Sequence, residues 1–289
     1  MTKAHGLGDF LSDCPFRRGD GRMTAVQRGH IVVTDAHAHT GTKEETRERI
    51  RDGIMTMICA GEPEDAKRLD EILKWPGAIQ ALVPAAGLHP WNSGKTSVED
   101  MMPFMEKYPV IGEIGMDTFW CDVPVKVQRE AFERQLAFAM EQKKPAVLHT
   151  KAQEKEIARI LRDYPNRYLV HWYSCSRFLD EYLEQDCYVS IGPDVVWNPA
   201  VQEAARRVPK NRILAETDGL GAVEWALKEG EKMGIKNTLP SAAPVRPVGA
   251  SLEQTIKCSA GLRGMDPADL AIRIRENMIR FLSNGIASS

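Results

Sequence analysis

The sequence predicts an α/β protein with a (β/α)8 TIM-barrel fold. Eight short apolar segments with strand character alternate with helical segments along the chain, and this alternation is typical of a parallel sheet covered by helices. The length of 289 residues fits a single barrel domain. An open doubly wound sheet is the alternative, but it normally carries a Gly-rich loop after its first strand, where this chain has His37-Ala38-His39.

The first half of the chain contains four strand-then-helix units. Short apolar runs, several of them rich in β-branched residues, predict strands at 31–34, 54–60, 79–88 and 110–115. Charged, helix-forming residues predict a helix at 43–51, and further helices are expected at 63–73, 98–108 and 128–143, the first and last of these with apolar residues at helical spacing. Pro63 fits the first turn of its helix, where the missing N–H has no partner to lose.

The second half repeats the pattern four times. Strands are expected at 146–149, 168–172, 187–191 and 213–218, with helices at 154–164, 178–185 and 201–207. A Gly- and Pro-rich stretch with a short helix around Trp225 follows, and then helices at 251–262 and 267–282. Residues 31–289 are expected to form one domain, preceded by an N-terminal extension, residues 1–30, that is at most partly ordered.

Composition limits the classes of function. A net charge of -2 excludes a globally basic nucleic-acid binder, although it leaves a local basic groove open. No apolar run approaches the roughly 20 residues that span a bilayer, and no signal peptide is recognisable, so no membrane association is expected. None of the six cysteines has the two-residue spacing of a zinc ribbon or redox motif. They are expected to be mostly buried thiols in a reducing compartment, the cytoplasm.

Polar side chains stand at the ends of six of the eight predicted strands, and five of the seven histidines belong to this set. One such histidine is as readily explained by a hydrogen bond in the core, but the whole set favours a common site, because active sites of these barrels lie at the carboxyl ends of the strands. The set consists of His37, His39, His89, Glu113, His149, His171 and Asp218.

Imidazole and carboxylate ligands without thiolate suit a catalytic site for Zn²⁺, Mn²⁺, Mg²⁺ or Fe²⁺. His37 and His39 should point the same way, because side chains two apart on a strand share a face. Barrel closure brings Asp218 beside them. Glu113 can bridge to a second ion, about 3.5–4 Å away, held by His149 and His171. One or two divalent metal ions are therefore expected.

Six segments, in this order and at barrel spacing, make the chain similar to a known family from about residue 30 onward. They are Asp35-Ala36-His37-Ala38-His39, Gly87-Leu88-His89-Pro90, Gly112-Glu113-Ile114-Gly115-Met116-Asp117, Leu148-His149-Thr150-Lys151-Ala152, His171-Trp172-Tyr173-Ser174 and Glu216-Thr217-Asp218. With them the chain resembles the TatD-related metal-dependent hydrolases, the TatD family deoxyribonucleases of the amidohydrolase superfamily.

The resemblance implies a hydrolase-type TIM barrel with assigned metal ligands. It implies that one ion is held by His37, His39, Glu113 and Asp218, and a second by Glu113, His149 and His171. The sequence departs from the family pattern in three places: the thirty leading residues, Trp172-Tyr173-Ser174-Cys175 where Cys-Phe-Ser-Gly is common, and Gly219-Leu220 in place of Ser-Pro. These changes leave the ligands intact and alter the wall of the pocket.

The expected chemistry is hydrolysis by a metal-activated water. Asp218 is the candidate general base and, with Glu113, a candidate catalytic residue. His89 either contacts substrate phosphate or donates a proton, or else makes a structural hydrogen bond to a loop. Lys151 either binds phosphate as a point charge or is a solvated lysine at a helix start.

Aromatic residues also cluster near the strand ends, and they can stack on bases or simply pack the barrel rim. They are Trp91, Phe119, Trp120, Trp172, Tyr173 and Trp197. Together with His89 and Lys151, Trp172 is a candidate substrate contact.

Three functions are compatible with these observations. The resemblance implies a phosphodiesterase acting on DNA, most simply a 3′-end exonuclease. A small-molecule hydrolase for an amide, a lactone or a phosphate ester would use the same site. A metal-binding scaffold without turnover is the third, although a scaffold does not require open metal positions. The sequence carries no signal of the oligomeric state.

Overall fold

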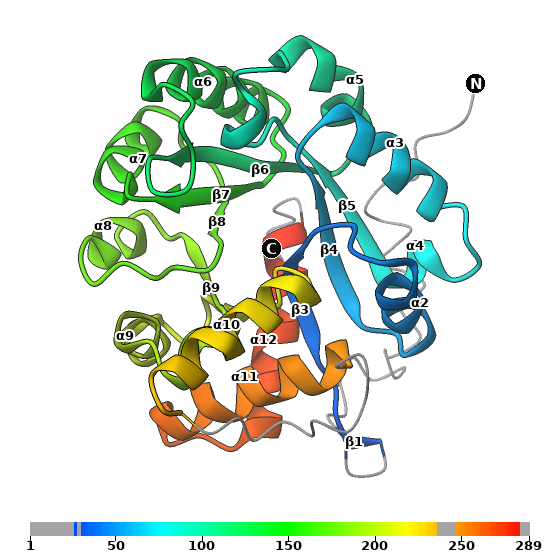
Figure 1. The fold of residues 1–289 in the computed structure, drawn as a ribbon, viewed down its shortest axis with the longest axis vertical. Helices are drawn as coiled ribbons and strands as arrows, with labels where there is room; N and C mark the ends of the chain where they lie inside the picture. Colours follow the sequence, from blue (N-terminus) through cyan, green and yellow to red (C-terminus); the bar gives the residue numbers. More distant parts are fainter. Residues whose placement is uncertain (1–25, 28–29, 236–246, 284–289) are drawn as a thin grey trace, which may run out of the picture.

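The computed structural model describes residues 26–27, 30–235 and 247–283. Eight strands form one parallel sheet in the order β3 to β10, each beside its neighbour in the chain. In Figure 1 the strands surround the centre and the helices form an outer ring. The predicted (β/α)8 barrel is therefore confirmed. The barrel strands are β3 (Thr34–Ala38), β4 (Met55–Ala60), β5 (Leu82–Ala86), β6 (Val110–Asp117), β7 (Ala146–Lys151), β8 (Tyr168–Val170), β9 (Tyr188–Ile191) and β10 (Ile213–Ala215).

Helices connect successive strands and cover the outside of the sheet. The α-helices are α2 (Lys43–Arg51), α3 (Pro63–Ile72), α4 (Ala78–Ala81), α5 (Val98–Lys107), α6 (Val125–Glu141), α7 (Glu154–Ile160), α8 (Leu179–Leu183), α9 (Pro199–Arg207), α10 (Leu220–Lys232), α11 (Val248–Arg263) and α12 (Pro267–Leu282). Short 3-10 helices are η1 (Pro90–Asn92), η2 (Leu161–Asp163) and η3 (Pro193–Val196).

The ring closes between the end of β10 and β3. The backbone N–H of Asp218 donates to the carbonyl of His37 at 3.0 Å, and the N–H of Thr217 donates to Asp35 Oδ1 at 2.9 Å. Helix α12 packs against both β10 and β3, and α11 packs against α12. The two C-terminal helices therefore cover the seam, and the first and last strands place their polar ends side by side.

The first barrel strand lies further along the chain than predicted. β3 covers Thr34–Ala38, whereas Ile31 belongs to β2 (His30–Ile31), which pairs antiparallel with β1 (Val26–Gln27) outside the barrel. The prediction of 31–34 follows apolar residues, but three of the five residues of β3 are buried polar ones, and the partners of Asp35 come from distant parts of the chain.

Other boundaries also differ from the predictions, most by a few residues. The predicted strand 79–88 begins as a helical turn, α4, and only Leu82–Ala86 joins the sheet as β5. Helix α10 is thirteen residues long, whereas only a short helix around Trp225 is predicted. The expectation for residues 1–30 lies mostly outside the described residues.

The described cysteines are Cys59, Cys121, Cys175, Cys187 and Cys258, and all of them are free thiols. Two of them, Cys59 and Cys187, are buried, and the other three are partly buried. Within the described part of the chain, no helix is both long and apolar enough to cross a membrane.

Candidate metal centre

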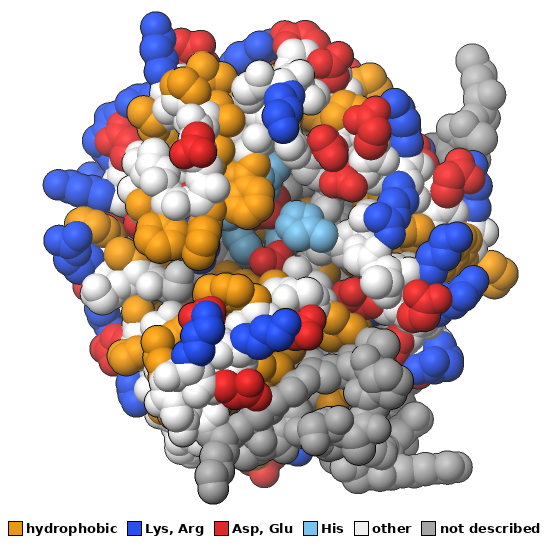
Figure 2. Space-filling model, in the orientation of Figure 1, with side chains coloured by type: hydrophobic (Ala, Val, Ile, Leu, Met, Phe, Trp, Pro, Cys, Tyr) orange, Lys and Arg blue, Asp and Glu red, His pale blue; other side chains and the backbone are white. Residues whose placement is uncertain are grey.

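The polar strand ends meet in a hollow at the centre of the barrel face. Figure 2 shows histidine and carboxylate side chains at the bottom of this hollow, with hydrophobic side chains along its rim. Groups of histidine and carboxylate atoms that could hold a metal ion lie here, from His37, His39, His89, Glu113, His149, His171 and Asp218. The structure therefore brings together the whole set that the sequence singled out.

The first group is formed by His37, His39, Glu113 and Asp218. Nε2 of His37 lies 3.3 Å from Glu113 Oε2 and 3.2 Å from Asp218 Oδ1. Nε2 of His39 lies 3.4 Å from the same two oxygens. The two histidines of the pair thus point the same way, as the strand geometry predicts.

The chemistry of these atoms fits a divalent cation. Nε2 of His37, Oε2 of Glu113 and Oδ1 of Asp218 are buried without a hydrogen-bond partner, and leaving such groups unpaired is costly. The four distances of 3.2–3.4 Å between Nε2 of His37 or His39 and the facing oxygens of Glu113 and Asp218 place these atoms close enough to share one small cation. A cation among these four atoms would satisfy all of them.

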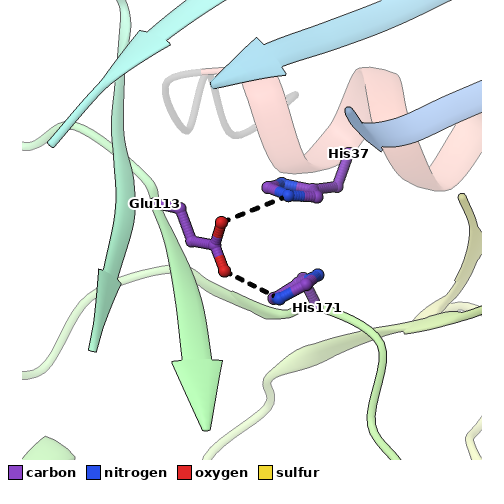
Figure 3. A group of neighbouring side chains, drawn as sticks. All are labelled: His37, Glu113 and His171. Carbon is purple, nitrogen blue, oxygen red and sulfur yellow. Dashed lines mark ion pairs between the residues drawn. The ribbon is translucent and has the colours of Figure 1, made fainter. Parts of the chain in front are cut away.

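The second group shares Glu113 with the first. Oε1 of Glu113 lies 2.6 Å from His149 Nδ1 and 2.7 Å from His171 Nε2, and those two nitrogens are 3.3 Å apart. Figure 3 shows Glu113 between His37 and His171, with one oxygen directed at each. The carboxylate therefore faces a separate set of nitrogens with each of its oxygens, as a bridging ligand must.

Electrostatics keep Glu113 and Asp218 ionised. Burial raises the pKa of Glu113, but the surrounding histidines, His171 and His37 above all, hold it well below its usual range. The pKa of Asp218 is lowered to about 2, because interactions with His37 and His39 outweigh its burial. Burial lowers the pKa of His171, but Glu113 raises it to about 9. Both carboxylates are therefore ionised at neutral pH, and a bound cation would displace the protons that they hold on His37, His39 and His171.

Three of the histidines are oriented through their second ring nitrogen. Nδ1 of His39 lies 3.2 Å from the carbonyl of Cys59, Nδ1 of His171 lies 3.1 Å from Glu216 Oε1, and Nε2 of His149 lies 2.9 Å from Asp117 Oδ2. Such partners fix ring orientation and tautomer at metal sites. The sequence motifs contain Glu216 and Asp117, but nothing in their spacing indicated this role.

A buried ionic network holds the loop that carries Asp218. Arg49 donates to Asp35 Oδ2 at 2.5 Å and to Glu45 Oε1 at 2.9 Å. It also donates to Thr217 Oγ1 at 3.1 Å, and Glu45 Oε1 accepts from the N–H of Leu220 at 3.2 Å. The guanidinium of Arg49 thus contacts β3, which contains His37, and Thr217, which precedes Asp218. Through Glu45 it is also linked to Leu220, which follows Asp218.

Gly115 lets β6 approach β7 closely beside the site. It pairs with His149 in the sheet register. A Cβ at Gly115 would overlap the carbonyl oxygen of His149. Only glycine, which has no Cβ, allows Glu113 and His149 to lie on adjacent strands at this spacing.

His89 both supports a loop and faces the metal centre. Its Nδ1 accepts a hydrogen bond from the N–H of Trp91 at 3.2 Å, so the ring proton belongs on Nε2, which lies 3.7 Å from Glu113 Oε2. Burial lowers the pKa of His89 to about 4. The side chain is therefore a neutral hydrogen-bond donor at neutral pH, rather than a cation.

Lys151 is held in place rather than free in solvent. Its Nζ donates to the carbonyl of Trp172 at 2.9 Å and to Ser174 Oγ at 3.0 Å. The indole N–H of Trp172 donates to Asp194 Oδ1 at 2.7 Å. The structure thus joins two predicted substrate contacts, Lys151 and Trp172, into one unit anchored by a buried carboxyl.

Asp194 should give the protein a characteristic dependence of stability on pH. Burial raises its pKa from 3.8 to about 6, partly opposed by Asn198, Lys151 and Trp172. Between about pH 4 and 6, the carboxyl of Asp194 is ionised in the unfolded chain but still protonated in the native state. Its contribution to the free energy of unfolding is therefore fully present below pH 4 and is lost as the pH rises through 6. The loss is at most about 3 kcal/mol.

Urea unfolding between pH 4 and 7 tests this expectation with an Asp194→Asn variant, which cannot titrate. The stability of the variant relative to the original should rise from pH 4 to 6 and then level off. A difference that stays constant across this range would contradict the assignment.

Comparison with known proteins gives one matching family model and several similar proteins. A family model described as TatD related DNase matches residues 34–283. The uncharacterized metal-dependent hydrolase YabD of Bacillus subtilis is 26% identical over 205 residues, which cover 65% of this chain and 80% of YabD. The human 3′-5′ RNA nuclease TATDN2 is 31% identical over 123 residues, which cover 39% of this chain but only 16% of TATDN2.

Solved structures share the fold. The crystal structure of YjjV, a TatD homolog from Escherichia coli K12, superposes with a TM-score of 0.68 at 22% identity and covers 85% of this chain and 95% of YjjV. At this identity the likeness concerns the barrel alone.

Proposed function

Because the chain belongs to the TatD-related DNase family and is a metal-dependent hydrolase, we propose that it is a deoxyribonuclease that shortens DNA strands from the 3′ end. The observation that carries the proposal is Glu113, whose two oxygens face two separate groups of histidines. A carboxylate shared in this way is typical of two-metal phosphodiester hydrolysis. The name of the human relative adds the 3′-to-5′ direction, although its substrate is RNA.

The proposed ligands divide between two ions. His37, His39, Glu113 and Asp218 would hold the first, because Nε2 of both histidines faces the two oxygens, and the facing atoms of His37, Glu113 and Asp218 are buried without hydrogen-bond partners. Glu113, His149 and His171 would hold the second. The ions themselves would be Zn²⁺, Mn²⁺, Mg²⁺ or Fe²⁺; the imidazoles favour Zn²⁺ and Fe²⁺, and the carboxylates favour Mg²⁺ and Mn²⁺.

Divalent ions, when bound, would lower the pKa of a water molecule and neutralise charge on the phosphoryl oxygens. Asp218 stays ionised at neutral pH, and its side chain is partly exposed to the hollow, so its carboxylate can accept a proton. The Nε2–H of His89 faces the same hollow and can donate a hydrogen bond to a phosphoryl oxygen. The oxygen of water would bond to phosphorus, and the leaving oxygen would take up a proton as its bond breaks.

Purified full-length protein, supplied with Mg²⁺, Mn²⁺ or Zn²⁺, tests the proposal on single-stranded DNA labelled at either end. We expect stepwise loss of the 3′ label and a ladder from the 5′-labelled strand, both abolished by a chelator. A phosphorothioate at the 3′-terminal linkage should slow the reaction.

Several outcomes would contradict the proposal. Metal-dependent turnover of small phosphate esters, amides or lactones, with DNA left intact, would indicate the small-molecule hydrolase instead. Loss of the 5′ label first would reverse the polarity. Metal binding without turnover of any of these compounds would leave only a scaffold.

We also propose that the protein acts in the cytoplasm, on DNA and without a membrane partner. The free thiols of the described cysteines support a reducing compartment. Localisation of the tagged protein by cell fractionation is the corresponding test.

A further inference from the structure

Three exposed aromatic rings stand side by side next to the metal centre, and a fourth lies behind them. Phe119 and Trp120 follow β6, Trp225 is on α10, and their exposed fractions are 68%, 56% and 42%. Ring centroids are 4.6 Å apart for Phe119 and Trp120, 6.3 Å for Trp120 and Trp225, and 6.0 Å for Trp225 and the buried Trp172. We call Phe119, Trp120, Trp225 and Trp172 the aromatic wall.

Hydrogen bonds attach the aromatic wall to the candidate metal ligands. Oδ1 of Asp117 accepts from the backbone N–H of Phe119 at 2.7 Å and of Trp120 at 2.8 Å. The other oxygen of Asp117 contacts His149 Nε2. At the opposite end, Trp172 directly follows His171 in the chain. Both ends of the wall are therefore fixed within one or two residues of the site.

The arrangement of the rings leaves apolar faces open to solvent. The three ring pairs meet at interplanar angles of 84°, 90° and 68°, so none of them is stacked face to face. Large aromatic side chains are usually buried, and a contiguous exposed group of them marks a binding surface. The hydrophobic rim in Figure 2 lies beside the hollow that contains the histidines.

A fixed positive charge accompanies these rings. Nζ of Lys151 lies 5.8 Å from the centroid of the Trp172 ring, and Lys151 is two residues beyond His149 on the same strand. Flat apolar faces beside a cation match the two parts of a nucleotide, a base and a phosphate. Aromatic faces bind bases of any sequence, provided that those bases are unpaired and unstacked.

We propose that the aromatic wall binds unpaired bases of a single DNA strand whose 3′-terminal linkage lies in the metal centre. This inference rests on the proposed nuclease function and adds to it the residues that would hold the bases of the substrate strand. A base inside a duplex already has both faces covered by its neighbours, and is therefore not available to the wall.

Binding of a fluorescent five-nucleotide DNA strand to the full-length protein, measured by anisotropy, tests the wall without requiring turnover. Trp225→Ala should weaken binding about 5- to 100-fold, as loss of one stacked base does, and Trp225→Phe should restore most of it. Trp120→Ala should behave similarly. Met233→Ala is the matched control, because Met233 is exposed at the far end of α10, and it should have no effect.

Removing the base instead of the ring makes the test specific. A strand with an abasic residue next to its 3′ nucleotide should bind the original protein about as weakly as the intact strand binds Trp225→Ala or Trp120→Ala. In at least one of these variants, the abasic residue should then weaken DNA binding only slightly further, because the stacked pair is already lost. If the rings had only a structural role, the effects of the abasic residue and of the substitution on affinity would be independent and would multiply in both variants. Duplex DNA with blunt ends should bind weakly to every variant.

Each alternative outcome overturns a defined part of the account. Unchanged affinity for the DNA strand in both Trp225→Ala and Trp120→Ala would overturn the inference. So would a loss of affinity seen only when an RNA strand of the same length replaces the DNA. Dissociation of an oligomer in these variants, seen by sedimentation without weaker DNA binding, would assign the wall to a second copy of the chain. Wall-dependent binding without hydrolysis would support base binding by the wall but overturn the nuclease function on which the placement of the 3′-terminal linkage rests.

Discussion

Replacing Glu113 with glutamine is expected to lower kcat/KM by about a thousandfold or more and to weaken binding of both metal ions. The substitution keeps the side-chain volume but removes the negative charge and one of the two oxygens that face His37, His39, His149 and His171. A metal ion contributes several kcal/mol of charge stabilisation in the transition state, and each 1.36 kcal/mol corresponds to a factor of ten. Isothermal titration with Mn²⁺ or Zn²⁺, beside the DNA assay, measures both effects.

Glu130→Gln provides the matched control for this prediction. Glu130 is on α6 and its side chain is mostly exposed, so its replacement should change neither metal binding nor hydrolysis. If Glu113→Gln bound two ions as tightly as the original protein, Glu113 would not be the bridging ligand. Circular dichroism spectra and melting curves of the two variants show whether a loss of activity reflects unfolding instead.

Replacing Arg49 with alanine is expected to destabilise the protein by about 3–5 kcal/mol, because it leaves the buried carboxylates of Asp35 and Glu45 without their partner. The guanidinium is almost wholly buried, and although burial lowers its pKa, the two carboxylates raise it above the usual value. Since the same guanidinium contacts Thr217, the variant should also lose activity through misplacement of Asp218. Urea unfolding at neutral pH measures the stability.

Arg51→Ala is the control on the same helix. Arg51 also pairs with a carboxylate, Asp52, but its side chain is exposed, and an exposed ion pair contributes little to stability. An equal loss of stability in Arg49→Ala and Arg51→Ala would show that the network at the seam does not hold the barrel closed. The two positions therefore separate buried from exposed charge on one helix.

The sequence was sufficient to predict the barrel, because alternating strands and helices are a local pattern. It was weakest where that pattern is interrupted by polar residues. The predicted first strand lies several residues before β3, because Asp35 and His37 are polar but buried there. Their burial depends on Arg49 and on partners in β6 and beyond β10, and no local rule can indicate such contacts.

The candidate ligands were visible because histidines and carboxylates at the ends of buried strands are unusual. The residues that orient these ligands could not be predicted in this way. Asp117, Glu216 and Arg49 reach the site only through the folded ring. Trp225 was expected only within a short helix, yet α10 places it against Trp120 and Trp172. Such contacts join residues about 30 to 170 positions apart and arise only when the barrel closes.

The most direct test of the two-metal centre is a crystal structure of the protein with Mn²⁺, examined by anomalous diffraction at the manganese edge. We expect two anomalous peaks, one among His37, His39, Glu113 and Asp218 and the other among Glu113, His149 and His171. A single peak, or peaks that do not share Glu113, would contradict the account.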